Sequence, residues 1–235
     1  MHLSVVIPAY NEEKRIRGTL SRIHDFLEKK NYSYEVIVVD DGSIDDTVGV
    51  IAGTMLSSEN KLKIVQNGRN RGKGFSVKNG INASSGDFVL FSDADMSTPI
   101  EEIDKLFKYI NLGYDIAAGS RNVQSSDVRM HQPWYRETMG KTFNLIVKFI
   151  LLDDFKDTQC GFKLFRGDIA RELAREIRID GFCFDVEMLY LAKIRGYRMK
   201  EAGVVWDNSP QSRVKVFNSS LNMFLDLFRI RVLHR

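Results

Sequence analysis

The sequence has few cysteines, no long apolar run and a small net charge. Its two cysteines, Cys160 and Cys183, lack metal-ligand spacing, which is typical of a reduced, intracellular protein with its thiols packed inside. The apolar stretch 145–152 is too short to span a bilayer and contains Lys148. The N-terminus has no basic-then-apolar signal segment. A formal charge of +3 over 235 residues gives no argument for nucleic-acid binding. We therefore expect a soluble or peripheral protein.

Two phosphate-binding motifs are also missing. A dinucleotide-binding sheet carries Gly-x-Gly-x-x-Gly after its first strand, whereas this chain has Pro8-Ala9-Tyr10-Asn11-Glu12 there. The same absence argues against a sugar nucleotidyltransferase. The glycine-rich segment 67–74 opens a predicted helix and can cradle a phosphate. It lacks the Lys-Ser/Thr ending of a P-loop, which excludes an ATPase of that kind.

Short apolar runs alternate with helical patterns, which is typical of a parallel sheet with crossover helices. We expect strands at 4–7, 35–39, 62–65, 88–91, 115–118, 163–165 and 199–206. Helices are expected at 12–30, 47–56, 73–83, 99–109, 136–152, 169–178, 185–196 and 218–235, and a polar loop at 122–135. Since no linker or repeat interrupts the pattern, one α/β domain should cover 1–235.

Acidic residues follow three of the predicted strands. Glu12 comes after the first strand, Asp41 after the second, and Asp93 and Asp95 after the fourth. In open α/β sheets, ligands bind beyond the carboxyl ends of the strands. Gathered carboxylates repel one another unless a cation or hydrogen-bond donors compensate. A nucleotide sugar supplies both, because its base and ribose donate hydrogen bonds and its pyrophosphate brings a divalent ion. An isolated Asp-x-Asp is usually a solvated loop, but its repetition at strand ends favours a nucleotide-sugar site.

These segments resemble family 2 glycosyltransferases of the GT-A fold, and more narrowly the polyprenyl-phosphate glycosyltransferases. The motifs at 157–165, DTQCGFKLF, and 184–187, FDVE, are most similar to those of dolichyl-phosphate β-glucosyltransferases. The resemblance runs from Val5 to about Arg231. It implies a single Rossmann-like GT-A domain with a mostly parallel sheet. Its parts would be a nucleotide-sugar half at 1–121, an acceptor half at 122–216, and an amphipathic C-terminal helix at 217–235.

The resemblance also implies site residues. It assigns the donor base and ribose to five positions: Pro8, Tyr10, Glu12, Val39 and Asp41. The pair Asp93 and Asp95, with Ala94 between them, would hold Mg²⁺ or Mn²⁺ and the diphosphate, and Arg213 would approach that diphosphate. Ser97 stands where mannosyl relatives often have Gln as a further metal ligand. Arg121 and Arg136 match arginines that meet the acceptor phosphate.

The acceptor determines which chemistry is needed. A sugar hydroxyl requires a general base, whereas a phosphate monoester has a second pKa of about 6 and is already an anion at neutral pH. Arg121, Arg129 and Arg136 favour a phosphate acceptor, although Arg129 is equally consistent with a solvated loop. Asp157 can orient the acceptor, act as a base or cap a turn. The predicted catalytic set is Asp95, Asp157, Arg121 and Arg136.

The terminal helix has an apolar stripe and a basic end. The stripe consists of Leu221, Phe224, Leu225, Phe228 and Val232, and the end carries Arg229, Arg231, His234 and Arg235. Such a helix, together with 143–152, can lie in a membrane interface, or its stripe can pack on the core or an oligomer partner. We expect peripheral association with the cytoplasmic face of a membrane, where a polyprenyl phosphate is found.

The sequence as a whole predicts an inverting, metal-dependent hexosyltransferase. The predicted reaction moves glucose from UDP-glucose onto a polyprenyl or dolichyl phosphate. The alternatives are a mannosyltransferase that uses GDP-mannose, a family 2 transferase that acts on a glycan hydroxyl, and a non-catalytic nucleotide-sugar-binding module.

Overall fold

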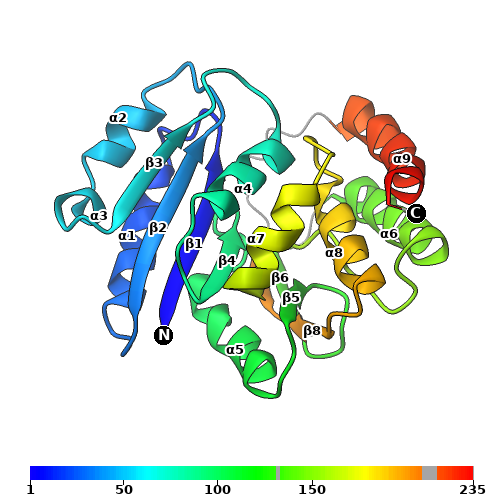
Figure 1. The fold of residues 1–235 in the computed structure, drawn as a ribbon. Helices are drawn as coiled ribbons and strands as arrows, with labels where there is room; N and C mark the ends of the chain where they lie inside the picture. The colour runs from blue at the N-terminus through cyan, green and yellow to red at the C-terminus, as the bar shows by residue number, and fades with distance from the viewer. Residues whose placement is uncertain (131–132, 208–215, 235) are drawn as a thin grey trace.

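A mostly parallel seven-stranded sheet forms the centre of the protein, as the sequence predicts. The computed structural model describes residues 1–130, 133–207 and 216–234; of Arg136 and 216–221 it describes the backbone only. The strand order is β3-β2-β1-β4-β7-β5-β8 (Figure 1). The strands are β1 (His2–Ala9), β2 (Ser33–Asp40), β3 (Leu62–Gln66), β4 (Phe88–Ser92), β5 (Ile116–Ser120), β7 (Phe162–Arg166) and β8 (Met199–Gly203). Only β7 runs antiparallel to its neighbours in this sheet.

Helices cover both faces of the sheet, giving a three-layer α/β arrangement. On one face lie α4 (Lys73–Asn82), α6 (Trp134–Ile150), α7 (Gly167–Glu176), α8 (Phe184–Ile194) and α9 (Val216–Leu233). On the other face lie α1 (Ile16–Leu27), α2 (Thr47–Ala52), α3 (Met55–Ser58), the 3₁₀ turn η1 (Ile100–Glu102) and α5 (Ile103–Asn111). Successive buried residues of β1 alternate between the two cores, Val6 to the first and Val5 and Ile7 to the second, because strand side chains point to opposite faces.

The antiparallel strand β7 brings a late segment to the edge where the parallel strands end. Because β7 runs against β4, its first residue Phe162 pairs with Ser92, the last residue of β4. The amide of Asp93 continues this contact by donating to the carbonyl of Gly161 at 3.1 Å. The segment before β7 therefore lies beside the acidic pair. The strand order also reverses at β1, between β2 and β4, which is where open α/β sheets bind ligands.

Three sequence predictions about individual elements are wrong. The helix predicted at 47–56 is two short helices, α2 and α3, separated at Gly53 and Thr54. The stretch predicted as a loop contains a strand, β6 (Asp127–Met130). The single strand predicted at 199–206 breaks at Val204 into β8 and β9 (Val205–Asp207), and β9 pairs with β6 in a separate two-stranded sheet. Because β6 and β9 lie far apart in the chain, no local pattern reveals their pairing.

Helices α6 and α9 pack against each other (Figure 1). The inner face of α9 buries Leu227 and Ile230 in the core, whereas Phe224, Leu225, Phe228 and Val232 of the predicted stripe are exposed. The side chain of Leu221, predicted to lie on that stripe, is outside the described residues. His234 does not join the basic end, because it turns inward and bonds the buried carboxylate of Glu187 at 2.7 Å. Across the described residues, none of the helices has both the length and the apolarity needed to span a membrane.

Candidate active site

The acidic pair lies in a tight turn at the end of β4. The turn is closed by Met96, which has a φ of 51° and whose amide donates to the carbonyl of Asp93 at 3.2 Å. The amide of Ser97 donates to Asp95 Oδ1 at 3.0 Å. Gly161 packs against the Asp93 carboxylate so closely that a Cβ there would lie 2.1 Å from Oδ2. The position of each carboxylate is thus set by neighbouring backbone.

Cationic side chains compensate the charge of this pair. Lys73 Nζ lies 2.5 Å from Asp93 Oδ1, with 19% of the lysine side chain and 34% of the aspartate side chain exposed. Burial by itself lowers the pKa of Lys73, but Asp93 and Asp185 raise it above its ordinary value. The pKa of Arg15 is raised by its hydrogen bond to Glu12, and the charges of Asp95 and Asp93 add to this effect. The negative charge of the acidic pair is therefore compensated by neighbouring cations, and the Asp93 side chain is partly exposed.

A buried ion pair connects the motif at 157–165 with the motif at 184–187. Lys163 Nζ donates to Asp185 Oδ1 and to the carbonyl of Cys160, both at 2.7 Å. Burial raises the pKa of Asp185, although both Lys163 and Lys73 act in the opposite direction. Lys163 comes from the motif at 157–165 and Asp185 from the motif at 184–187. This ion pair therefore holds the two motifs next to each other in the folded protein. Cys160 and Cys183 are both buried, as predicted.

Asp41 organises the glycine-rich segment 67–74. It is buried and accepts hydrogen bonds from the amides of Arg71 at 2.9 Å and Gly72 at 2.8 Å, and from Asn67 Nδ2 at 2.8 Å. Gly72 has a φ of 109°, and a Cβ there would lie 2.4 Å from the carbonyl oxygen of Asp180. This fixed backbone places the next residue, Lys73, as the first residue of α4. That the Asp41 carboxylate contacts the donor base stays a prediction.

The other predicted base and ribose residues lie at the ends of β1 and β2. Pro8 pairs in register with Val39, and Val39 is fully buried. Tyr10 is exposed just beyond β1. The Glu12 carboxylate is bonded by Arg15, and the Glu12 amide donates to Thr47 Oγ1 at 2.7 Å. The structure brings these residues together at one edge, and their contact with a donor stays a prediction.

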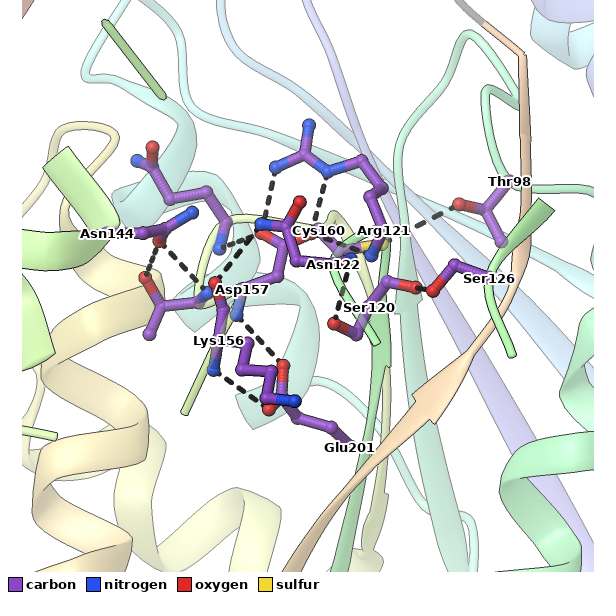
Figure 2. A network of polar contacts seen from close by, with 12 residues as sticks. Thr98, Ser120, Arg121, Asn122, Ser126, Asn144, Lys156, Asp157, Cys160 and Glu201 are labelled. Carbon is purple, nitrogen blue, oxygen red and sulfur yellow. Dashed lines mark hydrogen bonds and ion pairs between the residues drawn. The ribbon is translucent and has the colours of Figure 1, made fainter. Parts of the chain in front are cut away.

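Arg121 and Asp157 form a bidentate ion pair at the end of β5 (Figure 2). Arg121 Nε lies 2.7 Å from Oδ2 and Nη2 lies 2.8 Å from Oδ1, while the Arg121 amide also donates to Oδ2 at 2.9 Å. Asp157 is fully buried, whereas 25% of the Arg121 side chain is exposed. Burial by itself raises the pKa of Asp157, but Arg121 lowers it below its ordinary value. A carboxylate so held is ill-suited to accept a proton and well suited to orient the arginine.

Asp93 and Arg121 follow β4 and β5, the two strands that flank β7, so both lie at the same edge of the sheet. Burial lowers the pKa of Arg121, yet Asp157 raises it well above its ordinary value and the charge of Asp93 adds to that effect. Arg121 also lies 5.4 Å from the ring centre of Trp206 in β9. The short strand β9 therefore lies next to Arg121 in the candidate site.

Glu201 on β8 holds the backbone at Asp157 in place, a role that the sequence analysis did not predict. Its two carboxylate oxygens accept hydrogen bonds from the amides of Lys156 at 2.8 Å and Asp157 at 2.9 Å (Figure 2). Asn144 of α6 holds the next residue, accepting from Thr158 Oγ1 at 3.1 Å. Glu201 faces this turn because it pairs in register with Ala118 of β5. That register is a tertiary feature, so no signal near position 201 reveals the role.

The remaining predicted basic residues are not all placed by the structure. Arg129 lies on β6, exposed and paired with Asp127 at 3.0 Å, an arrangement that also suits a purely solvated strand. Arg136 falls in the first turns of α6, but its side chain is outside the described residues. Arg213 lies wholly outside them. The acceptor and donor roles of these three arginines stay predictions.

The comparison with protein families identifies the class of this protein. Residues 4–174 match Glycosyl transferase family 2, and the chain belongs to that family. It is 38% identical over 244 residues to dolichyl-phosphate β-glucosyltransferase of Drosophila melanogaster, covering 99% of this chain and 75% of the relative. It is 35% identical over 242 residues to the protein of the same name from Homo sapiens, covering 98% and 75%. The protein is thus a glycosyltransferase enzyme, as the sequence predicts.

Solved structures show the same GT-A fold. Glucosyl-3-phosphoglycerate synthase from Mycobacterium tuberculosis, solved with Mn²⁺, UDP and phosphoglyceric acid, superposes with a TM-score of 0.71 at 19% identity, covering 97% of this chain and 78% of that one. Mannosyl-3-phosphoglycerate synthase from Rubrobacter xylanophilus gives a TM-score of 0.71 at 20% identity, covering 99% and 74%. At these identities the likeness concerns the fold.

Proposed function

We propose that this enzyme transfers glucose from UDP-glucose to a polyprenyl phosphate such as dolichyl phosphate, with inversion and with Mg²⁺ or Mn²⁺. The observation that carries the proposal is the meeting of the acidic pair with the Arg121–Asp157 ion pair at one sheet edge. The relatives' name supports the sugar and the acceptor. The UDP and Mn²⁺ of the mycobacterial synthase support the donor and the metal.

The donor side fits a divalent ion. Asp93 and Asp95 offer carboxylate oxygens, the ligands that Mg²⁺ and Mn²⁺ prefer, and 34% of the Asp93 side chain is exposed. A bound ion neutralises charge on a leaving diphosphate. The hydrogen bond from the Ser97 amide restrains the Asp95 carboxylate, which supports this role. Pro8, Tyr10, Glu12, Val39 and Asp41 would hold the base and ribose, Ala94 would line the same turn, and Arg213 would approach the diphosphate.

The acceptor side fits an anion that needs no base. Arg121 presents its guanidinium beside the acidic pair, with Asp157 fixing its plane from the buried side. Arg136 and Arg129 would complete the phosphate site. A phosphate oxygen of the acceptor attacks the anomeric carbon on the face opposite the leaving UDP, which inverts the configuration. Since the phosphate is already an anion near neutral pH, Asp157 stays ionised and acts by position rather than by proton transfer.

The exposed outer faces of α6 and α9 would contact the membrane that holds the acceptor. They carry Leu145, Phe149, Phe224, Leu225, Phe228 and Val232. Exposed cations such as Lys148 and Arg229 accompany them, and each basic group near an anionic leaflet contributes about 1 kcal/mol. Such a surface can bind from the cytoplasmic face as a peripheral protein. Co-sedimentation with anionic vesicles should weaken with salt, and protein that stays in the supernatant at low salt would contradict this part.

The reaction is tested by a matched set of donors and acceptors. UDP-glucose and GDP-mannose should be incubated with phytanyl or undecaprenyl phosphate, or with soluble sugars, with and without Mn²⁺. The proposal predicts a lipid-phosphate product from UDP-glucose that requires the metal and has the inverted anomeric configuration. If lipid-phosphate product forms with GDP-mannose but not with UDP-glucose, the enzyme is a mannosyltransferase. If product forms on soluble sugars but not on the lipid phosphates, the acceptor is a hydroxyl group. Donor binding without turnover on any acceptor would favour a binding module.

A further inference from the structure

The contact between Lys73 and Asp93 places an ammonium group where the proposed function needs a metal ion. Nζ lies 2.5 Å from Asp93 Oδ1, so the lysine occupies a carboxylate oxygen that a divalent ion would take as a ligand. Gly161 packs against the same carboxylate, because a Cβ there would lie 2.1 Å from Oδ2 and 2.6 Å from Oδ1. Asp93 therefore has little freedom to turn away from the lysine and serve a metal elsewhere.

The lysine is built into this place by its surroundings. Asp41 fixes the two amides before it, and Gly72 passes the carbonyl of Asp180 at a distance that only glycine allows. The neighbouring carboxylate, Asp185, is already held by Lys163 at 2.7 Å. The ammonium of Lys73 contacts Asp93 Oδ1, an oxygen that solvent does not reach.

We propose that Lys73 is a resident cation that holds Asp93 while the donor is absent and passes to the donor diphosphate when metal and donor arrive together. This inference rests on the proposed function. An ammonium and a divalent ion at one carboxylate repel each other in the partly buried site. A diphosphate supplies the additional negative charge that lets both cations remain. The lysine would therefore suppress metal binding to the donor-free enzyme and make metal and donor bind as a unit.

The test measures Mn²⁺ binding to donor-free protein, for instance by the loss of free Mn²⁺ signal in electron paramagnetic resonance. Lys73→Met should bind Mn²⁺ about tenfold more tightly than the wild type, a coupling within the usual range for two ligands of one site. In the presence of Mn²⁺, the same variant should bind UDP about tenfold more weakly. These opposite shifts are not expected from simple damage to the site.

Two variants serve as controls. Lys73→Arg keeps the charge and should keep Mn²⁺ binding weak. Lys78→Met removes another lysine of α4, whose Nζ bonds the carbonyl of Ile177, and should change neither affinity. If Lys73→Met unfolds, which its thermal transition will show, Lys73→Gln takes its place.

The outcomes separate this inference from the proposed function. If wild-type protein binds UDP in a Mn²⁺-dependent manner but removal of Lys73 leaves Mn²⁺ affinity equal or lower, the resident-cation inference is wrong and the donor site stands. If the wild type shows no Mn²⁺-dependent UDP binding, the proposed donor site itself is wrong, and the inference falls with it.

Discussion

The site contains two ion pairs, Lys73–Asp93 and Arg121–Asp157, which differ in whether the carboxylate or the cation is more exposed to solvent. In the pair at the end of β4, the carboxylate of Asp93 is the more exposed partner. In the pair at the end of β5, the carboxylate of Asp157 is buried and the guanidinium of Arg121 is the partner that solvent reaches. The first pair therefore presents negative charge to an arriving ligand and the second presents positive charge. In the proposed function, this edge of the sheet would receive a cation with its diphosphate beside an anionic acceptor.

The largest effect should come from removing negative charge on the donor side. Asp95→Asn keeps the oxygen that accepts from the Ser97 amide but loses a charged ligand. Because metal stabilisation of a leaving group contributes several kcal/mol, turnover should fall by about 1000-fold or more. The measurement is glucose transfer at saturating Mn²⁺, with Asp104→Asn on the surface as control. Near-native activity would sink the metal assignment.

Removing Arg121, the proposed acceptor-binding cation, should lower stability and weaken acceptor binding. Arg121→Met leaves Asp157 buried without its counterion, which should lower the free energy of unfolding by about 3–5 kcal/mol. The double variant with Asp157→Asn should recover much of this stability in denaturant titrations. It should nevertheless retain a raised KM for the lipid phosphate, with donor binding unchanged. Recovery of acceptor affinity in the double variant would show that Arg121 is purely structural.

A substitution at Gly161 tests whether the position of the Asp93 carboxylate affects donor binding more than acceptor binding. Gly161→Ala places a methyl group against the Asp93 carboxylate, and overpacking of this kind costs about 1–3 kcal/mol. Mn²⁺-dependent UDP binding, followed by calorimetry, should weaken more than acceptor binding does. Gly18→Ala in α1 is the matched control, because nothing lies within 4 Å of its added Cβ. Equal effects from the two substitutions would mean that Asp93 tolerates displacement.

The smallest effect on ligand binding is expected at Glu201, because it acts on Arg121 only through Asp157. Glu201→Gln replaces one acceptor oxygen by a donor facing a backbone amide, so one hydrogen bond to a charged group, worth about 1.5–3 kcal/mol, is lost. The KM for lipid phosphate should rise while UDP binding stays unchanged. Glu101→Gln on the surface should alter neither quantity. A change confined to the thermal transition would reduce Glu201 to a structural role.

The sequence predicted those parts of the molecule that depend on local patterns. The buried runs of β1, β2 and β4 and the acidic residues beyond them were recognisable because each strand and its end are continuous in the chain. The pairing of β6 with β9, the contact of Lys163 with Asp185, and the support of Asp157 by Glu201 were not. Each joins residues brought together by strand register, which single-sequence periodicity does not contain.

The antiparallel strand β7 has a consequence for how the chain acquires its fold during synthesis. It lies between β4 and β5, so the central sheet has a gap until residues 162–166 have been made. A ribosome that has released only the first 121 residues exposes unpaired edges on both strands, and such edges invite aggregation. We therefore expect residues 1–121 to be unable to fold alone and to depend on the later segment for closure of the sheet.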